Sequence, residues 1–174
     1  VYSRGTAAGK RVQAMGGAKN HGIIMPDADL DQAVKDIIGA AYGSAGERCM
    51  ALPVTVPVGA KTAQALREKL LTEIETLKVG VSTDAAAQYG PVVTAAHRQK
   101  ISDYIQLGVE EGAELVVDGR DFKLQGYEKG FFIGPSSFYK RLREMPHDLL
   151  QKINMTRISY INDLFGHENV AREQ

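Results

Sequence analysis

The chain has 174 residues, 44% hydrophobic and 24% charged, proportions typical of one ordinary soluble globular domain. Its 21 basic and 21 acidic residues cancel, so the sequence has no net basic charge with which to bind nucleic acid or an anionic membrane. One cysteine excludes an intramolecular disulfide, and the four histidines and the cysteine lack metal-ligand spacing. We therefore expect an intracellular protein, cytoplasmic or, in a eukaryote, in the mitochondrial matrix.

The first residues alternate between helical and extended patterns. Residues 1–10 predict a short helix rich in Ala and Gly, and residues 11–15 predict a strand that enters the double glycine Gly16-Gly17. Glycine there permits a backbone turn that a side chain would obstruct. A phosphate-binding loop is excluded, because the required glycine and hydroxyl residues are absent around Gly9-Lys10.

Next comes a short strand and a capped helix. Residues 22–25 predict an apolar strand, and the turn at residues 26–29 supplies a carboxylate cap for a helix that begins near Leu30. Apolar side chains then recur at helical spacing on one face, at Leu30, Val34, Ile37, Ile38 and Ala41. We expect that face to be buried and the helix to end in the small-residue loop at 43–46.

The following stretch predicts a strand and a helix with a structural role. Residues 52–58 predict the next strand, and Pro53 and Pro57 indicate either an edge strand or a short central one. Residues 61–78 predict a long amphipathic helix with a buried face made by Ala63, Leu66, Leu70, Ile74 and Leu77.

The second half continues the alternation. Thr94 is positioned to cap a helix whose inward side chains are expected to be Ile101, Tyr104, Ile105 and Val109. Residues 115–117 and 130–135 predict two further strands. Strands that alternate with helices indicate an α/β fold, with helices on a mostly parallel sheet.

The loop after residue 46 holds the candidate reactive group. It places Cys49 behind a run of small residues, and a cysteine nucleophile needs a nearby cation or an array of N–H groups to form its thiolate. Arg48 is the adjacent cation. Position alone leaves open the alternative that Cys49 is a small buried hydrophobe.

Two motifs resolve this ambiguity. Residues 46–51 read Gly-Glu-Arg-Cys-Met-Ala, and residues 9–21 read Gly-Lys-Arg-Val-Gln-Ala-Met-Gly-Gly-Ala-Lys-Asn-His, followed by Met-Pro-Asp-Ala-Asp at 25–29. Over residues 1–138 the sequence resembles the aldehyde dehydrogenase superfamily, in particular its methylmalonate-semialdehyde dehydrogenase branch. The resemblance implies a remnant of the NAD-binding domain at 1–15, an incomplete catalytic domain at 16–138 and a divergent tail at 139–174.

The resemblance also implies covalent chemistry at Cys49. The Cys49 thiolate would attack an aldehyde, NAD would take a hydride, and the resulting thioester would be released. Hydrolytic relatives have a water-activating glutamate where this chain has Ala14, so transfer to coenzyme A is the expected fate. The implied reaction converts methylmalonate or malonate semialdehyde to propionyl- or acetyl-coenzyme A.

Other residues receive secondary roles. Arg48 is expected to bind a substrate carboxylate or else to pair structurally with Glu47 or a neighbouring helix. Glu47 is a candidate modulator of the thiol, and Asn20 and His21 are expected to anchor loops. In the tail, Asp163 and Phe165 echo the acidic-Ile-Phe-Gly-Pro segment whose glutamate holds the nicotinamide ribose in the family.

Two rival functions remain open from the sequence. The first alternative to the aldehyde dehydrogenase is a truncated, inactive fragment that assembles with itself or with a full-length homologue. The second is a thiol-dependent acyl carrier or weak esterase that needs Cys49 and no dinucleotide. The partner expected for the dehydrogenase is a small-molecule aldehyde substrate.

Overall fold

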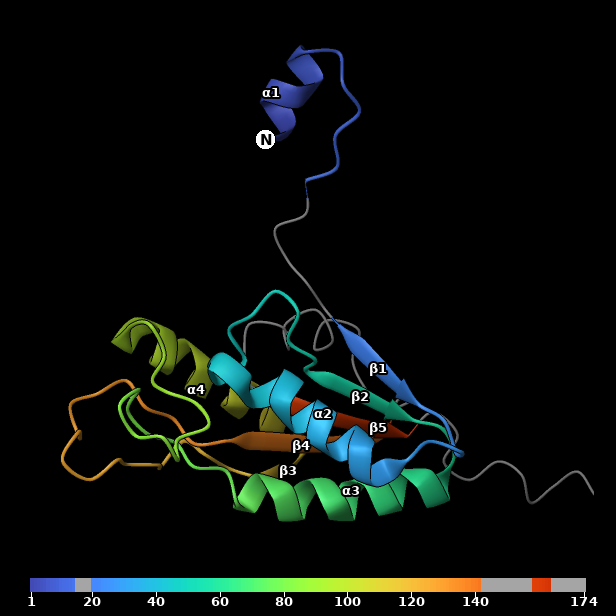
Figure 1. Cartoon of the computed structure of the whole chain (residues 1–174), viewed down its shortest axis with the longest axis vertical. Helices are drawn as coiled ribbons and strands as arrows, with labels where there is room; N and C mark the ends of the chain where they lie inside the picture. The colour runs from blue at the N-terminus through green and yellow to red at the C-terminus, as the bar shows by residue number, and fades with distance from the viewer. Residues whose placement is uncertain (15–19, 142–157, 164–174) are drawn as a thin grey trace, which may run out of the picture.

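The computed structural model describes residues 1–14, 20–141 and 158–163, and Figure 1 shows the whole chain. In chain order its elements are α1 (Tyr2–Ala7), β1 (His21–Ile24), α2 (Leu30–Tyr42), the 3-10 turn η1 (Gly43–Gly46), β2 (Val54–Pro57), α3 (Ala60–Glu75), α4 (Ala95–Glu110), β3 (Glu114–Val117), β4 (Ser136–Arg141) and β5 (Ile158–Asp163). The predicted alternation of strands and helices, and with it the α/β fold, is confirmed.

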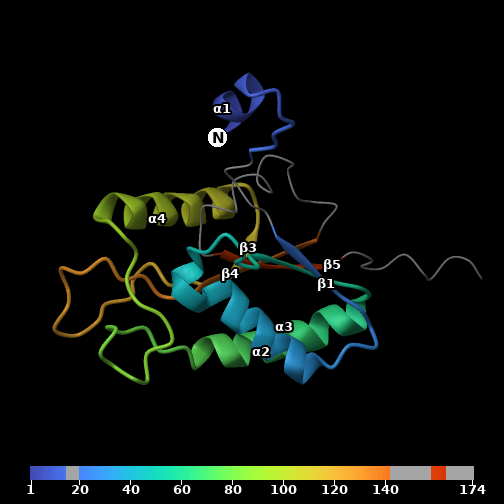
Figure 2. The same ribbon diagram turned by 45° about the horizontal axis from the view of Figure 1, so that its top comes forward.

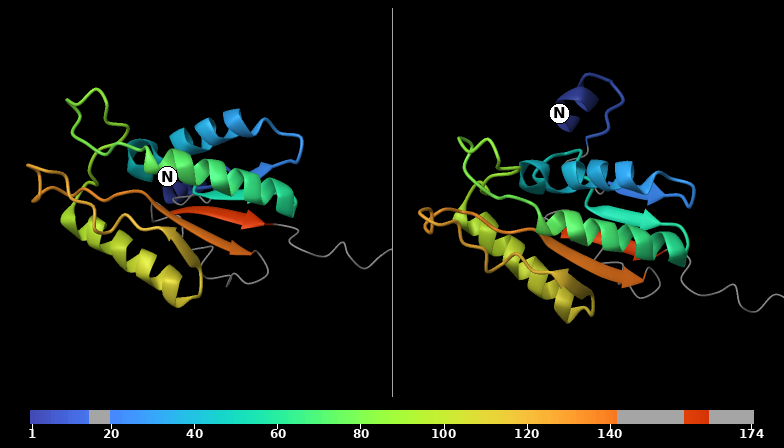
Figure 3. Two further views of the ribbon diagram at one scale, coloured as in Figure 1. Left: turned by 90° about the horizontal axis from the view of Figure 1, so that it is seen from below. Right: turned by 60° about the horizontal axis from the view of Figure 1, so that its bottom comes forward.

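One sheet organises these elements. Its strand order is β1-β2-β5-β4-β3, with parallel pairing from β1 to β4 and antiparallel pairing between β4 and β3. Helices α2 and α3 cover one face and α4 covers the other (Figures 2 and 3). A parallel sheet needs this cover, because its strands are apolar on both faces.

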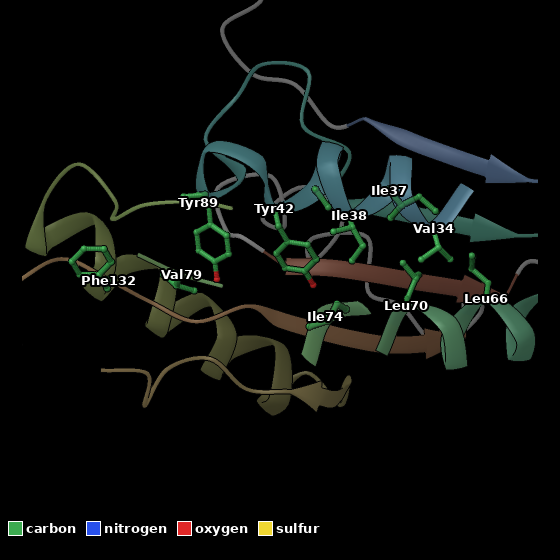
Figure 4. Packing of buried hydrophobic residues seen from close by; sticks show 12 residues of the cluster. Val34, Ile37, Ile38, Tyr42, Leu66, Leu70, Ile74, Val79, Tyr89 and Phe132 are labelled. Carbon is green, nitrogen blue, oxygen red and sulfur yellow. The ribbon is translucent and has the colours of Figure 1, made fainter. Parts of the chain in front are cut away.

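Each face has its own buried cluster. On the α2 and α3 side the core contains Val34, Ile37, Ile38, Tyr42, Leu66, Leu70, Ile74, Val79, Tyr89 and Phe132, and Figure 4 shows the α2 and α3 side chains pointing toward one another. On the α4 side it contains Val54, Val56, Val92, Ile101, Ile105, Ala113, Ile133 and Phe138. Most of the buried faces predicted for α2 and α3 is confirmed. The exceptions are Leu30 and Leu77, which are only half-buried, and Leu77 lies beyond the end of α3.

Local signals set the start of two helices. The Asp29 carboxylate accepts hydrogen bonds from the N–H groups of Asp31 and Gln32 at 3.0 and 3.1 Å, and the Thr94 hydroxyl accepts one from His97 at 3.1 Å. Both predicted caps are therefore confirmed, and each satisfies N–H groups that have no partner within the helix.

Strand β2 lies inside the sheet, between β1 and β5. All four of its residues are buried, and just after Pro57 the Val58 N–H donates to Ile24 O of β1 at 2.8 Å. Of the two sequence-based alternatives, the short central strand is correct and the edge strand is wrong.

The predicted strand at residues 130–135 is wrong, because β4 begins only at Ser136. The chain before it packs closely against a neighbouring turn: a Cβ added to Gly119 would lie 2.2 Å from the Gly134 carbonyl carbon, and Gly134 N–H donates to Gly119 O at 2.8 Å. Pro135 has no N–H to offer a ladder. The glycines therefore serve backbone contact, and the sheet starts after them.

The inward face of α4 also differs from the prediction, and Tyr104 is only half-buried. Val109 is 39% exposed, whereas Gly108 is buried against Phe138, whose ring would lie 2.9 Å from a Cβ added at that glycine. Ile101 and Ile105 are buried as expected. The large Phe138 ring fills the space that a side chain at 108 would need, and this displaces the contact by one residue.

The first residues lie apart from the sheet (Figure 1). Helix α1 confirms the predicted helix but has no buried residue, and residues 11–14 have no regular structure, so the strand predicted there is wrong over the described residues. Without a neighbouring strand, an extended segment has no ladder to join. The domain boundary predicted between residues 15 and 16 falls outside the described residues.

The tail contributes a strand to the middle of the sheet. Strand β5 pairs with β2 on one side and with β4 on the other, in a register that sets Asp163 opposite Arg141. The sequence did not predict this strand, because pairing between residues far apart in the chain leaves no local pattern.

A charged turn follows β3 and contacts α4 through a side-chain hydrogen bond. Arg120 donates from Nε to the Asp118 carboxylate at 2.9 Å and from Nη1 to Gln106 Oε1 at 2.8 Å. The hydrogen bonds from Arg120 hold the pKa of Asp118 below its ordinary value.

We therefore predict a pH-dependent effect of Asp118→Asn. A lowered folded-state pKa means that the carboxylate stabilises the fold above its unfolded-state pKa of about 3.9 and loses this contribution as pH falls through the folded value. The variant should be less stable than wild type near neutral pH and equally stable in strong acid, measured by urea unfolding. A difference that persists unchanged into strong acid would contradict this account.

Candidate active site

The loop before Cys49 has an unusual backbone. Helix α2 ends at Tyr42, and Ser44, Ala45 and Gly46 follow with φ angles of 50°, 61° and 71°. Residues with a Cβ rarely adopt this left-handed region, at a cost on the order of 1–3 kcal/mol each. Such a conformation persists only where surrounding contacts enforce it.

Cys49 lies in the turn that follows. Ala51 N–H donates to Arg48 O at 3.1 Å and closes the turn, while Cys49 is exposed and Met50 is 71% exposed. The alternative that Cys49 is a buried hydrophobe is therefore wrong. Exposure gives the thiol access to a reagent in solution.

Asn20 fixes the far side of this turn. Its Nδ2 donates to Cys49 O at 3.0 Å and to Ala51 O at 2.8 Å. The loop-anchoring role predicted for Asn20 is confirmed. Asn20 immediately precedes β1, so its hydrogen bonds attach the turn that bears Cys49 to the edge strand of the sheet.

Arg48 reaches back along α2. Its Nη2 donates to Gly39 O in the last turn of the helix, a carbonyl that also accepts from Gly43 N–H. Carbonyl groups at the C-terminal end of a helix carry partial negative charge, which favours a cation there. A Cβ at Gly43 would lie 2.3 Å from the same nitrogen, so glycine at 43 leaves room for the guanidinium. Of the two structural partners expected for Arg48, the neighbouring helix is therefore correct and Glu47 is wrong.

Glu47 pairs instead with a residue that the sequence did not indicate. Its Oε1 lies 3.1 Å from His97 Nδ1 near the start of α4, an ion pair when the imidazole is protonated. No local pattern could reveal the pair, because residues 47 and 97 meet only through the fold. The Cys49 loop thereby contacts elements on both faces of the sheet.

The residues predicted to bind the cofactor are only partly described. Asp163 is the last residue of β5, where the structure gives its main-chain position, and Phe165 lies outside the described residues. Ala14 is exposed in the irregular segment after α1.

The described part of the chain has few features of other kinds of site. No three His, Cys, Asp or Glu side chains gather there to hold a metal ion. None of the helices in that part of the chain has the length and apolar composition needed to cross a bilayer. A hollow of about 450 Å³ touches the Cys49 loop only at Ser44 and is otherwise lined by residues 80–82, 84 and 87–91 and by Phe132.

Comparison with known proteins places the chain in a family. The profile of the Aldehyde dehydrogenase family matches residues 1–147, beyond the limit at 138 that the motifs suggested. Malonate-semialdehyde dehydrogenase of Pseudomonas aeruginosa is 55% identical over 145 residues, which are 83% of this chain and 29% of that protein. The acylating mitochondrial methylmalonate-semialdehyde dehydrogenase of Arabidopsis thaliana is 44% identical over 136 residues, 78% of this chain and 22% of that protein.

A solved structure agrees with these relatives. A Sinorhizobium meliloti protein crystallised with NAD superposes with a TM-score of 0.83 and 54% identity, over 93% of this chain and 33% of that one. The chain thus spans less than a third of the length of the two curated relatives. With the GERCMA segment on an exposed turn and this match over most of its length, the chain belongs to the aldehyde dehydrogenase family.

Proposed function

We propose that this chain is the nucleophile-bearing part of an acylating semialdehyde dehydrogenase, acting on malonate or methylmalonate semialdehyde. The observation that carries the proposal is Cys49, exposed on a turn held by Asn20 and Arg48, within a sequence similar to malonate-semialdehyde dehydrogenases. NAD as hydride acceptor and coenzyme A as acyl acceptor belong to the proposal for the whole protein. They are supported by the NAD complex and by the acylating relative.

The proposed role of Cys49 is covalent. The thiolate sulfur forms a bond to the carbonyl carbon of the substrate, and the carbonyl electron pair moves to oxygen. The main-chain N–H of Cys49 donates to that oxygen and stabilises the developing charge. A fixed turn favours this step because the thiol and the N–H belong to one residue and keep one mutual orientation.

Arg48 fits a role in substrate recognition alongside its structural bond. A guanidinium has five N–H donors, and the bond to Gly39 O uses only Nη2, while the side chain lies next to the nucleophile and is exposed. We propose that its remaining donors receive the substrate carboxylate, which distinguishes a semialdehyde from a simple aldehyde.

The similarity to semialdehyde dehydrogenases favours this proposal over an assembly fragment or a thiol acyl carrier. We place the activity in a reducing compartment, cytoplasm or mitochondrial matrix, where an exposed free thiol persists. Association with a second copy or with a full-length homologue remains a prediction.

The thiol chemistry can be tested on the chain itself. An activated ester such as p-nitrophenyl propionate should transfer its acyl group to Cys49, with one p-nitrophenolate released per chain, because the thiolate displaces the phenolate without a cofactor. Peptide mass spectrometry should locate the propionyl group on Cys49, and Cys49→Ala should show neither the adduct nor the burst. If Cys49 is alkylated by iodoacetamide but never acylated, the proposed role is wrong.

A further inference from the structure

The Cys49 loop is held from two directions. Asn20, next to β1, and Gly39, in α2, supply contacts from one side of the loop. The Glu47–His97 pair comes from α4, which covers the opposite face of the sheet (Figure 3). This pair therefore ties the loop to the second layer of the fold through a side-chain contact.

The backbone just before Glu47 has a disfavoured conformation that contacts such as the Glu47–His97 pair must hold in place. Ser44 and Ala45 both adopt left-handed φ angles, and Glu47 N–H donates to Ser44 O at 3.0 Å to close the turn. A conformation disfavoured at two residues relaxes unless contacts on both of its flanks oppose it. On the N-terminal side of these two residues the chain is held by Tyr42 and α2. On their C-terminal side, Glu47 is the first residue after η1.

The pair is partly shielded. The Glu47 side chain is 23% exposed and that of His97 is 36% exposed, and the start of α4 is itself fixed by the Thr94 cap and by Arg98, which donates to Gly130 O at 3.3 Å. An anchor on a capped helix terminus moves less than one on a loop, so His97 is a rigid point for the carboxylate.

We propose that Glu47 and His97 are positioning residues, which set the orientation of the Cys49 thiol and N–H by tying the loop to α4. This inference rests on the proposed function, because it assigns a use to that orientation. Neither side chain is assigned contact with the substrate. The sequence alone offered Glu47 only as a modulator of the thiol and gave no role to His97.

The test compares two reactions of the same thiol in the full chain, at one pH. Acylation by p-nitrophenyl propionate needs the thiol and the Cys49 N–H in register, whereas alkylation by iodoacetamide needs only an accessible thiol. Glu47→Gln, His97→Gln and the double variant should each slow acylation by about two- to fivefold, the range of partly exposed ion pairs, and leave alkylation unchanged. The double variant should be no slower than the single ones.

Two further variants make the result specific. His97→Lys keeps a cation near the carboxylate and should restore part of the acylation rate, which a packing defect would not permit. Asp31→Asn removes the ion pair between α2 and α3, away from the Cys49 loop, and should leave both reactions unchanged. Amide exchange at Glu47 and Ala51 should quicken by a similar factor in the Glu47 and His97 variants alone.

The outcomes separate the two proposals. If acylation and alkylation change together, or if neither changes, Glu47 and His97 do not position the thiol. If wild type is alkylated but never acylated, the proposed function fails. In that case amide exchange alone decides the inference: unchanged exchange at Glu47 and Ala51 overturns it, and faster exchange supports the tie between the loop and α4.

Discussion

In a complete relative that carries residues 1–138 of this chain, Ala14→Glu is expected to raise acyl release as free acid by about a hundredfold to ten-thousandfold in the absence of coenzyme A. Attack of water on a thioester needs a positioned base, and alanine supplies none. Attack by a coenzyme A thiolate needs much less help, because the thiolate is itself a strong nucleophile. The parent graft should therefore release its acyl group mainly to coenzyme A.

Single-turnover acylation followed by timed release, with and without coenzyme A, separates the two steps. Ala14→Gln is the matched control, since glutamine has the length of glutamate but cannot take a proton. If the glutamine variant accelerates hydrolysis equally, the effect is not base catalysis. If the parent graft releases free acid as fast as acyl-coenzyme A, another group supplies the base and the acylating assignment is wrong.

The second large effect concerns the core on the α4 side. Phe138→Ala is expected to destabilise the chain by about 3–5 kcal/mol, because the ring is fully buried in β4 and packs against Gly108. Its removal loses the buried apolar contacts and leaves a cavity next to a residue that has no side chain. A loss of this size is a large part of the roughly 5–15 kcal/mol available to a typical domain. Urea unfolding followed by circular dichroism measures it.

Phe131 provides a matched control, since it is the same residue type on the segment before β4 but is 37% exposed. Phe131→Ala should cost about 1 kcal/mol or less, as is usual for surface substitutions. Phe138→Leu should cost less than about 1.5 kcal/mol because it keeps most of the volume. Equal losses for the two alanine variants would show that Phe138 is not the centre of this core.

The parts of the fold that the sequence predicted depend on short-range patterns. Asp29 and Thr94 cap helices by reaching two or three residues along the chain, and the apolar spacing of α2 and α3 repeats within each helix. These signals are complete within one element. A single sequence therefore contains all the information that the prediction needs.

The errors share the opposite property. Gly130 and the residues after it have the composition of a strand, but Gly134 packs against Gly119, and only the fold brings these two together. The inward-facing residue of α4 is Gly108 and not Val109, because Gly108 packs against Phe138 of β4, which is distant in the sequence. The central place of β5 likewise depends on partners far away in the chain.

The candidate site divides in the same way. Cys49 and Arg48 were found from a contiguous motif, and Asn20 from its polar character beside a glycine turn. The partner of Arg48 at Gly39 and the partner of Glu47 at His97 were not predicted, since each contact depends on how α2 and α4 pack on the sheet. The motif identifies the reactive atom, and the fold determines how that atom is held.

The central claim is that Cys49 carries the acyl group, and the most direct measurement of it is a single turnover in the graft. With malonate semialdehyde and NAD but without coenzyme A, we expect one NADH per active site, a stalled second turnover, and an acyl group on Cys49 by peptide mass spectrometry. Cys49→Ala should give no NADH. NADH formation by the Cys49→Ala variant, or a full burst with the acyl group on another residue, would contradict the account.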